Sequence, residues 1–400
     1  MKFQTIEDLD VSNRVVLVRI DINVPLSPEG GILDDSRMVA HVPTIDRLAE
    51  VNAKVVLLAH QGRPGKRDFV PLVHHATALS RVLGRPVGYV DDLFGSAAMD
   101  KIKHAKPGDL LLLENTRFYS EEVCLANRPI GEQANTHLVK RLSSCVDCFV
   151  NDAFSVAHRS QPSIVGFPQV LPSGAGDLMV REITALQKVT GAGGIAILGG
   201  VKVDDSIAVM GNLLEKGCDV LTGGLVAQLF LVSQGIDVGG VNTRTLQNEL
   251  GEHYTKTLQD AGQLLTQYGG RIHLPQDLAV DDGGRVEIRI SELPVDKPIM
   301  DVGSKTIDAY AAELTKAGSI IVNGPMGVFE REGFGQGTER ILGAVASSKT
   351  FSVIGGGHTL GAAQRFGVEA EMGHVSTGGG ALLTFLAGKP MPGIEALMGK

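Results

Sequence analysis

An alternation of short apolar runs with stretches of helical period restricts the fold of this chain more than any other feature. The apolar runs lie at residues 15–18, 54–58, 110–113 and 148–150 in the first half, and at 195–198, 220–222, 320–322 and 351–354 in the second. Amphipathic stretches such as 38–48, 72–83 and 135–142 lie between them. Short apolar strands that alternate with helices are typical of parallel sheets with helices on both faces. The pattern therefore predicts an α/β fold.

The length and one change of composition predict two domains. At 400 residues the chain is too long for a single hydrophobic core. The prolines and glycines of QVLPSGAGDL, which begins at Gln169, indicate a boundary. We expect a first domain at 1–172, a hinge and interdomain helix at 173–190, a second domain at 191–372 and a tail at 373–400. Each domain is predicted to be a doubly wound, Rossmann-like parallel sheet, and a hairpin is predicted at 278–290.

The overall charge, the apolar segments and the cysteines exclude several classes of protein. A net charge of −8 argues against general nucleic-acid binding. No run approaches the roughly 20 apolar residues of a membrane span, and the N-terminal MKFQTIEDLD lacks the apolar core of a signal peptide. Cys145 and Cys148 form a lone C-x-x-C without a second pair for zinc, which indicates reduced structural thiols. We therefore expect a cytoplasmic protein without membrane or nucleic-acid partners.

Charged side chains follow the strands of the first half, at the sheet edge where open α/β sheets bind their ligands. A single arginine is more often an exposed surface residue. Its recurrence at successive strand ends of an acidic protein favours a pocket for a small, highly charged anion, because a guanidinium group binds phosphate and carboxylate oxygens in pairs. The residues at these ends are Arg19, Asp21 and Asn23; His60 and Arg63; Glu114, Asn115 and Arg117; and Asn151, Asp152, His158 and Arg159, with Arg37 at the start of the first helix.

Glycines follow the strands of the second half. Glycine pairs also serve as helix caps and plain turns, so that each pair alone is a weak signal. Together they suggest a nucleotide that lies across bare backbone amides, with its phosphates at helix N-termini. They stand at Gly199-Gly200, Gly223-Gly224, Gly324-Pro325, Gly355 to Gly357 and, in a tail loop, at Gly378 to Gly380.

Lys202 stands at the start of a predicted helix, where the helix dipole disfavours a cation by a few tenths to about 1 kcal/mol. It is either aimed at a phosphoryl group or a solvated surface lysine, and the local sequence leaves both interpretations open. The chain has no G-x-x-x-x-G-K-[ST] of a P-loop NTPase, and no G-x-G-x-x-G opens a helix as in NAD enzymes. An arginine-rich site with few carboxylates does not suit glycoside hydrolysis. The interpretation that remains is transfer between a nucleotide in one domain and a small anion in the other.

Eight motifs in order give the chain a resemblance to the phosphoglycerate kinase family along essentially its whole length. The motifs are VRIDINVP, AHQGRP, LLLENTRF, VNDAFSVAHRSQPSIVGF, AILGGVKVDDSI, VNGPMGVFE, IGGGHT and HVSTGGGA. The resemblance implies two doubly wound domains joined by a helix, with the C-terminal tail returning to the N-terminal domain. It also implies a reaction of glycolysis and gluconeogenesis, the reversible transfer of a phosphoryl group between 1,3-bisphosphoglycerate with MgADP and 3-phosphoglycerate with MgATP, carried out by domain closure.

The resemblance further implies roles for individual residues. Lys202 would stabilise the moving phosphoryl group, with Arg37, Gly357 and Gly380 as further catalytic residues, and Glu330 would accept hydrogen bonds from the ribose. Phosphoglycerate would be bound by Asp21, Asn23, Arg37, His60, Arg63, Arg117 and Arg159. The nucleotide would be bound by Gly199, Lys202, Gly223, Gly224, Asn323, Pro325, Glu330, Gly356, Gly357, His358 and Thr359.

Two positions depart from the pattern of most family members. Ser206 stands in place of a second lysine, and His358 stands in place of an aspartate that serves the metal-nucleotide. Asp205 is then the nearby acidic candidate for Mg²⁺, a cation that also binds phosphates and water. The GGGHT form and the short chain resemble the archaeal branch of the family, so the two changes are interpreted as branch variation and not as lost activity. An inactive nucleotide-binding scaffold and a kinase of another small acyl phosphate stay open as alternatives, and a monomer is expected.

Overall fold

The computed structural model describes residues 2–190 and 193–398, and the chain forms two compact units. Unit 1 comprises Met1–Ile183 with Pro390–Lys400, and unit 2 comprises Thr184–Lys389. Each unit contains a six-stranded sheet, which confirms the predicted α/β class with two parallel-sheet domains. Residue 191, where the second domain was expected to begin, and residues 1, 399 and 400 at the ends of the expected first domain and tail lie outside the described residues.

The sheet of unit 1 has all of its strands parallel, in the order β3-β4-β2-β1-β5-β6. Side chains alternate along β1: Val16 and Val18 pack on one face and Leu17 on the other, so an unbroken apolar run serves both layers of helices. Helices α1 and α2 cover the first face, and α3 and α6 cover the second. The strands are β1 (Val15–Arg19), β2 (Lys54–Leu58), β3 (Gly88–Tyr89), β4 (Leu110–Leu112), β5 (Cys148–Asn151) and β6 (Ser173–Ala175), and the helices are α1 (Ser36–Glu50), α2 (Val73–Leu83), α3 (Ser96–His104), α4 (Ser120–Cys124), α5 (Ile130–Ala134) and α6 (His137–Ser143).

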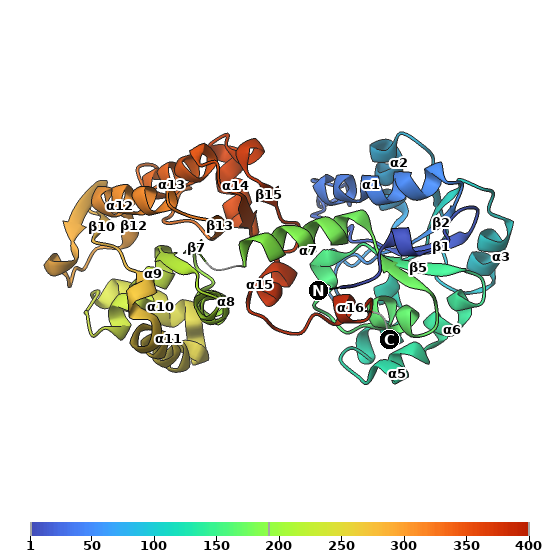
Figure 1. Cartoon of the computed structure of the whole chain (residues 1–400), viewed down its shortest axis with the longest axis horizontal. Helices are drawn as coiled ribbons and strands as arrows, with labels where there is room; N and C mark the ends of the chain where they lie inside the picture. The colour runs from blue at the N-terminus through green and yellow to red at the C-terminus, as the bar shows by residue number, and fades with distance from the viewer. Residues whose placement is uncertain (1, 191–192, 399–400) are drawn as a thin grey trace. The chain divides into compact units, whose positions relative to one another are not determined.

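The sheet of unit 2 is also parallel, with the order β15-β14-β13-β7-β8-β9. Helices α12, α13 and α14 pack on one face of it, while α8, α9 and α11 pack together on the other side (Figure 1). The strands are β7 (Gly194–Leu198), β8 (Asp219–Thr222), β9 (Ile272–His273), β13 (Ser319–Asn323), β14 (Ser352–Gly355) and β15 (His374–Val375), and the helices are α8 (Val203–Glu215), α9 (Gly224–Ser233), α10 (Gly240–Leu250), α11 (Tyr254–Tyr268), α12 (Ser304–Leu314), α13 (Gln336–Ser347), α14 (Gly357–Arg365) and α15 (Gly380–Leu386).

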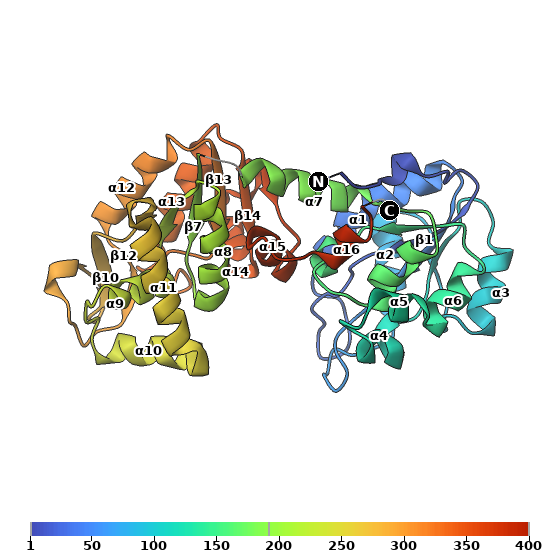
Figure 2. The same cartoon turned by 60° about the horizontal axis from the view of Figure 1, so that its bottom comes forward.

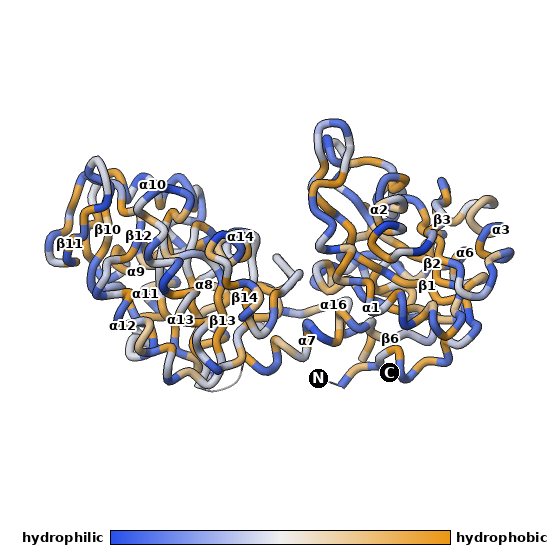
Figure 3. The backbone as a smooth tube through the Cα atoms, turned by 90° about the horizontal axis from the view of Figure 1, so that it is seen from above, coloured by the Kyte–Doolittle hydropathy of each residue, from blue (hydrophilic) through white to orange (hydrophobic). Residues whose placement is uncertain are grey.

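The predicted hairpin is confirmed as part of a small antiparallel sheet in unit 2. Strand β10 (Asp277–Asp281) pairs with β11 (Arg285–Arg289) across the turn at residues 282–284, and with β12 (Ile299–Val302) on its other side. The helices of unit 2 and this sheet can be followed from a second direction in Figure 2. Hydrophobic residues follow the strands of both large sheets (Figure 3). No helix among the described residues is long and apolar enough to cross a membrane.

One helix and the end of the chain join the two units along the sequence. Helix α7 (Asp177–Val189) begins in unit 1 and ends in unit 2. After α15 the chain returns to unit 1, where α16 (Pro392–Glu395) packs. Gln4 N donates to Leu397 O at 3.1 Å, and Gly393 N donates to Ala157 O at 2.8 Å. The C-terminal tail therefore completes the N-terminal unit, as the family resemblance implied.

Candidate active site

Unit 1 presents the predicted anion-binding residues at the carboxyl ends of its central strands. Parallel strands end at the same edge of a sheet, so several distant segments supply side chains to one place. Arg37 joins them as the second residue of α1. Asp21 and Asn23 follow β1, His60 and Arg63 follow β2, Arg117 follows β4, and Arg159 follows β5.

Asp21 anchors the guanidinium group of Arg37. Arg37 Nη1 and Ser155 Oγ both donate to Asp21 Oδ2, and Asn23 N donates to Oδ1 at 3.0 Å. Burial of Asp21 would raise the pKa of its carboxyl group, but the charge of Arg37 and the hydrogen bonds from Ser155 Oγ and Asn23 N outweigh burial and lower the pKa. Asp21 is therefore ionised near neutral pH and fixes the direction of Arg37.

The backbone at Gly62 joins Asn23 to Arg117. Gly62 N donates to Asn23 Oδ1 at 2.9 Å, and Arg117 Nη1 donates to Gly62 O. Gly62 has a φ of +68°, and a Cβ there would lie 2.3 Å from Asp68 O, so only glycine fits. This turn holds three predicted anion ligands together, because Arg63 is the next residue.

The arginines of this edge repel one another. Burial, followed by the charges of Arg159, Arg19 and Arg63, lowers the pKa of Arg117 to about 10. Burial also lowers the pKa of Arg159, and Arg63 and Arg37 add to the shift. Among the ion pairs formed by the described residues, none contains Arg63, Arg117 or Arg159. The excess positive charge suits an anion with several oxygens.

His60 is buried and neutral near pH 7, because burial and then the charge of Arg19 lower its pKa well below 6.5. Arg19 Nη2 lies 3.0 Å from His60 Nδ1. A guanidinium group only donates, so Nδ1 is the acceptor and Nε2 carries the proton. His60 can therefore donate one hydrogen bond to an anion without adding a charge.

Arg19, which the sequence placed at the same edge, lies beneath the site instead of facing a ligand. It is 1% exposed, and its Nε donates to Ser163 Oγ at 3.1 Å. Ser163 in turn donates from Oγ and N to the two carboxylate oxygens of Glu122, at 2.5 and 2.9 Å. Glu122 lies on α4 in the sequence SEEVC, which reads as a surface helix, so no sequence signal pointed to it.

His41 and its partner Asp152 are further residues behind the site. Asp21 N donates to His41 Nε2 at 2.9 Å, and His41 Nδ1 lies 2.6 Å from Asp152 Oδ2. Asp152 was predicted at a strand end, whereas the role of His41 was not predicted. A signal was present, since His41 stands between Met38 and Ile45 on the apolar stripe of α1, where a polar residue needs a buried partner.

The glycine strand ends of unit 2 differ from the expectation of bare amides. The N–H groups of Gly199, Gly200, Gly223 and Gly224 are bonded to neighbouring backbone, so they extend the pairing of β7, β8 and β13 and do not face a phosphate. A Cβ at Gly199 would lie 2.2 Å from Pro325 O, which shows that glycine is needed for the close approach of these chains. The bonds run from Gly199 N to Asn323 O at 3.1 Å, Gly200 N to Pro325 O at 2.8 Å, Gly223 N to Leu198 O at 3.1 Å and Gly224 N to Met326 O at 2.9 Å.

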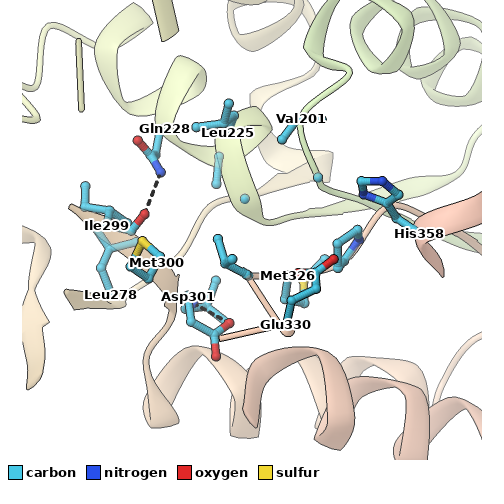
Figure 4. Close-up of a pocket in the computed structure, with 17 residues that line it drawn as sticks. Val201, Leu225, Gln228, Leu278, Ile299, Met300, Asp301, Met326, Glu330 and His358 are labelled. Atoms are coloured by element: carbon cyan, nitrogen blue, oxygen red, sulfur yellow. Dashed lines mark hydrogen bonds between the residues drawn. The ribbon is translucent and has the colours of Figure 1, made fainter. Parts of the chain in front are cut away.

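A cavity of about 250 Å³ lies beside these glycines (Figure 4). A largely apolar cavity with a few polar groups is the usual form of a site for a flat organic ring. Gln228 is 3% exposed, and its Nε2 donates to Ile299 O at 3.4 Å while its Oε1 has no partner among the described residues. The predicted ligands Glu330 and His358 are both exposed at the cavity. The apolar lining comes from Val201, Leu225, Leu278, Ile299, Met300, Val302, Pro325, Met326 and Val328.

The N-terminus of helix α14 lies next to the same cavity. Gly356, its N-cap, has a φ of +87°, and the N–H groups of the first turn, which starts at Gly357, have no acceptor within the helix. Thr359 is 2% exposed, and its Oγ1 accepts from Gly324 N at 2.8 Å, so it joins α14 to the end of β13. The N-terminus of α14 is therefore the part of unit 2 best suited to bind phosphate.

Lys202 is the N-cap of α8 and is exposed. Ser206, at the position of the expected second lysine, is buried, and its Oγ donates to Lys202 O at 2.9 Å. Ser206 thus bonds within its own helix, and Lys202 is a cation at the start of that helix. In the tail loop, Gly379 is the N-cap of α15 with a φ of +48°, and Gly380 is its first residue.

The metal candidate Asp205 lies on the exposed first turn of α8. It lines a separate groove of about 460 Å³ with Lys256 and Asp260, away from Glu330 and His358. Among the described residues no group of three or more His, Cys, Asp and Glu side chains could hold a metal ion. Mg²⁺ at nucleotide sites is usually held by phosphates, water and one or two carboxylates. The residues present therefore fit a metal that arrives with the nucleotide.

Known proteins resemble this chain over almost all of its length. The family model described as phosphoglycerate kinase matches residues 6–389. The chain is similar to the phosphoglycerate kinase of Methanothermus fervidus, with 48% identity over 99% of this chain and 97% of that protein. The phosphoglycerate kinase of Methanothermobacter thermautotrophicus is 47% identical to this chain, over 99% of this chain and 97% of that protein.

Two solved structures resemble the chain over its full length. The crystal structure of phosphoglycerate kinase from Pyrococcus horikoshii has a TM-score of 0.88 and 42% identity, and the match covers 98% of each chain. The structure of phosphoglycerate kinase from Coxiella burnetii has a TM-score of 0.84 and 34% identity, with 99% of each chain covered. These likenesses agree with the resemblance found in the sequence motifs.

Proposed function

This chain belongs to the phosphoglycerate kinase family, and on that premise we propose how its residues act in the reaction. As an enzyme of this family it transfers a phosphoryl group reversibly between 1,3-bisphosphoglycerate with ADP and 3-phosphoglycerate with ATP. The observation that carries the assignment of the sites is the cluster of unpaired arginines at the sheet edge of unit 1. All the substrate arginines and Lys202 are present, so the inactive scaffold has no observation in its favour.

The arginine cluster is proposed to bind the phosphate of 3-phosphoglycerate. Arg63, Arg117 and Arg159 supply charge that no carboxylate of the described residues neutralises by an ion pair, and His60 donates one neutral hydrogen bond. Arg37, held by Asp21, is proposed to contact the reacting end of the substrate. Binding of the anion relieves the mutual repulsion of the arginines, which favours a doubly charged ligand.

Unit 2 is proposed to bind the nucleotide with its base in the apolar cavity and its phosphates at the start of α14. Glu330 at the rim is placed to accept from ribose hydroxyls, and Lys202 is proposed to contact the phosphoryl group in transfer. Mg²⁺, when bound with the nucleotide, would neutralise phosphate charge, and Asp205 is the carboxylate of this chain proposed to reach it or its water.

The chemistry needs positioning and charge neutralisation more than acid–base catalysis. In the direction of ATP use, a carboxylate oxygen of 3-phosphoglycerate attacks the γ-phosphorus, and the bond to the β–γ bridging oxygen breaks with its electrons going to ADP. The attacking carboxylate is already deprotonated, so no general base is required, and a neutral His60 is consistent with this. Lys202 and Arg37 then serve to stabilise charge on the transferred group.

We propose that the two units close on each other when both substrates are bound, with the hinge at residues 172–176 and α7. An acyl phosphate hydrolyses readily, so a site completed only by closure protects the product from water. The cytoplasmic location and the monomeric state remain predictions, which cell fractionation and light scattering of the purified protein would check.

The first experiment is a steady-state assay of ADP release from MgATP and 3-phosphoglycerate, coupled to consumption of the bisphosphoglycerate formed. Arg117→Gln is expected to raise KM for 3-phosphoglycerate about 10- to 100-fold, the effect of losing about 1.5–3 kcal/mol from a hydrogen bond to a charged group, and to leave KM for ATP unchanged. Arg14→Gln is the control, because Arg14 is an exposed arginine paired with Asp10. Absence of turnover in a wild-type protein that still binds nucleotide would return the chain to the scaffold interpretation.

A further inference from the structure

A continuous row of hydrogen bonds runs from Arg37 to the start of α7, inside unit 1. Arg37 donates to the carboxylate of Asp21, the N–H of Asp21 donates to His41, and His41 bonds to Asp152. Leu178 N then donates to Asp152 Oδ1 at 3.0 Å. His41 is 1% exposed and Asp152 is 0% exposed, so water does not compete for these bonds.

The carboxylate of Asp152 selects one tautomer of His41. Its Nε2 lies 2.9 Å from Asp21 N, which donates to the neutral ring, and 3.2 Å from Asp21 O. Its Nδ1 must then carry the proton and donate to Asp152 Oδ2 at 2.6 Å. The carboxylate oxygen is an acceptor only, which selects this tautomer. A donor in place of the Asp152 carboxylate oxygen, or an acceptor in place of the Asp21 N–H, would break its hydrogen bond to His41.

Asp152 holds the first turn of α7 with its other oxygen. Oδ1 accepts from Leu178 N at 3.0 Å and from Met179 N at 3.4 Å. A Cβ at Gly176 would lie 2.1 Å from Oδ1, so the chain before the helix passes directly over the carboxylate. The start of α7 therefore cannot shift without moving Asp152, and α7 continues beyond residue 183 into unit 2.

We propose that His41 and Asp152 are positioning residues that couple binding of phosphoglycerate at Arg37 to the binding of nucleotide in unit 2 through helix α7. The inference rests on the proposed function, which supplies the ligand at Arg37. A ligand that changes the position of Arg37 acts on Asp21, and the two directional bonds of His41 pass that change to Asp152 and to α7. Coupling between two sites is reciprocal, so ADP must tighten phosphoglycerate binding by the same factor.

The test measures this coupling factor by calorimetry with ADP and 3-phosphoglycerate, a pair that cannot react. The Kd of ADP is determined alone and with saturating 3-phosphoglycerate, and the ratio of the two values is the coupling factor. In the wild type a factor of about 5 to 150 is expected.

Asp152→Asn is the main variant. It keeps the volume of the side chain at residue 152, but one hydrogen bond of the row from Arg37 to α7 must be lost. If the amide NH₂ faces His41, the ring takes the opposite tautomer, its Nε2–H can donate only to Asp21 O, and the N–H of Asp21 loses its acceptor. If the NH₂ faces α7 instead, it meets the amide of Leu178. His41→Asn is the second variant: its amide can still donate to Asp152, but no atom remains to accept from Asp21. In both variants the coupling factor is expected to fall to within about twofold of 1, a loss of most of the 5- to 150-fold range.

His75→Gln is the matched control, because His75 is also fully buried in a helix of unit 1 but bonds to Gln61 and lies outside the row. It is expected to keep the wild-type coupling factor even if it melts at a lower temperature. The inference is overturned if Asp152→Asn and His41→Asn keep the wild-type factor while folded, or if the wild type binds both ligands without coupling. Failure of the wild type to bind 3-phosphoglycerate would instead contradict the proposed function.

Discussion

Lys202 is a cation at the positive end of a helix, where a bound phosphoryl group would offset the unfavourable interaction of its charge with the helix dipole. It caps α8 beside the glycine turn, and Ser206 in the next turn bonds to its carbonyl oxygen. A lysine at this point is disfavoured by a few tenths to about 1 kcal/mol in the free protein. The same charge becomes favourable when a phosphoryl group lies in front of the helix.

Lys202→Ala is therefore expected to lower kcat by about 10²- to 10³-fold, the usual effect of removing one group that stabilises transition-state charge, and to leave the folded state as stable as before or slightly more so. Steady-state kinetics and a thermal melt measure the two effects. Lys216→Ala is the control, since Lys216 caps the opposite end of the same helix. A variant with normal kcat would make Lys202 a surface lysine, the alternative that the sequence left open.

Buried histidines make the stability of the protein depend on pH in a defined window. Burial, and then His74, lowers the pKa of His75 to about 4, and burial with Arg159 lowers the pKa of His158 to about 4. The unfolded chain takes up these protons near pH 6.5, and the folded chain does so only near pH 4. Both groups therefore contribute stability that is present above pH 6.5 and is lost as the pH falls from 6.5 to 4.

His75→Gln is expected to make the free energy of unfolding less dependent on pH between 6.5 and 4, by up to about 1.4 kcal/mol per pH unit. Urea titrations of wild type and variant at several pH values measure the difference. Burial raises the pKa of Glu122, so this residue changes the pH dependence of the free energy of unfolding in the direction opposite to that of the histidines. The decisive measurement is therefore the difference between wild type and variant, and not the wild-type curve alone. Parallel curves for the two proteins would mean that His75 is protonated in the folded state.

At the scale of strands and helices, the glycines of unit 2 fall into two kinds that the sequence could not tell apart. Gly199 has no room for a side chain, since a Cβ would lie 2.2 Å from Pro325 O. Gly357, on the first turn of α14, has nothing within 4 Å of such a Cβ. The first serves the packing of strand ends, and the second leaves space in front of a helix.

Gly199→Ala is expected to destabilise the fold. Overpacking a core usually costs about 1–3 kcal/mol, and the cost here should reach at least that range because backbone, and not a flexible side chain, must move. Gly357→Ala is expected to keep full stability and to weaken nucleotide binding about tenfold, because the methyl group fills the space where phosphate approaches. Chemical denaturation and calorimetry with ADP separate the two results. Equal behaviour of the two variants would contradict the distinction.

Much of the architecture could be predicted, because apolar runs with polar or glycine ends mark parallel strands directly. The carboxyl ends of β1, β2, β4 and β5 meet at one edge, so the arginine cluster followed from strand order alone. The contact between His41 and Asp152 could not be predicted, because 111 positions separate them and only the folded sheet brings them together. The use of glycine amides at 199–200 and 223–224 was also hidden, since sequence does not show what an N–H group bonds to.

At the scale of the whole molecule, the proposed reaction needs both substrates in one closed site. Small-angle scattering is expected to show a smaller radius of gyration with 3-phosphoglycerate and ADP together than with either ligand alone, because only the pair completes the site. The single-ligand samples are the controls. No compaction with both ligands present would contradict closure around residues 172–176 and α7.

The last residues of the chain belong to the unit that begins it. Met391, Ile394 and Leu397 are buried in unit 1, and the carbonyl of Leu397 accepts from Gln4 N. A ribosome delivers the sheet of unit 1 first, yet the segment that covers it leaves the exit tunnel last, after all of unit 2. The half that is made first is thus finished last, and synthesis that stops before residue 390 leaves unit 1 without the segment that covers it.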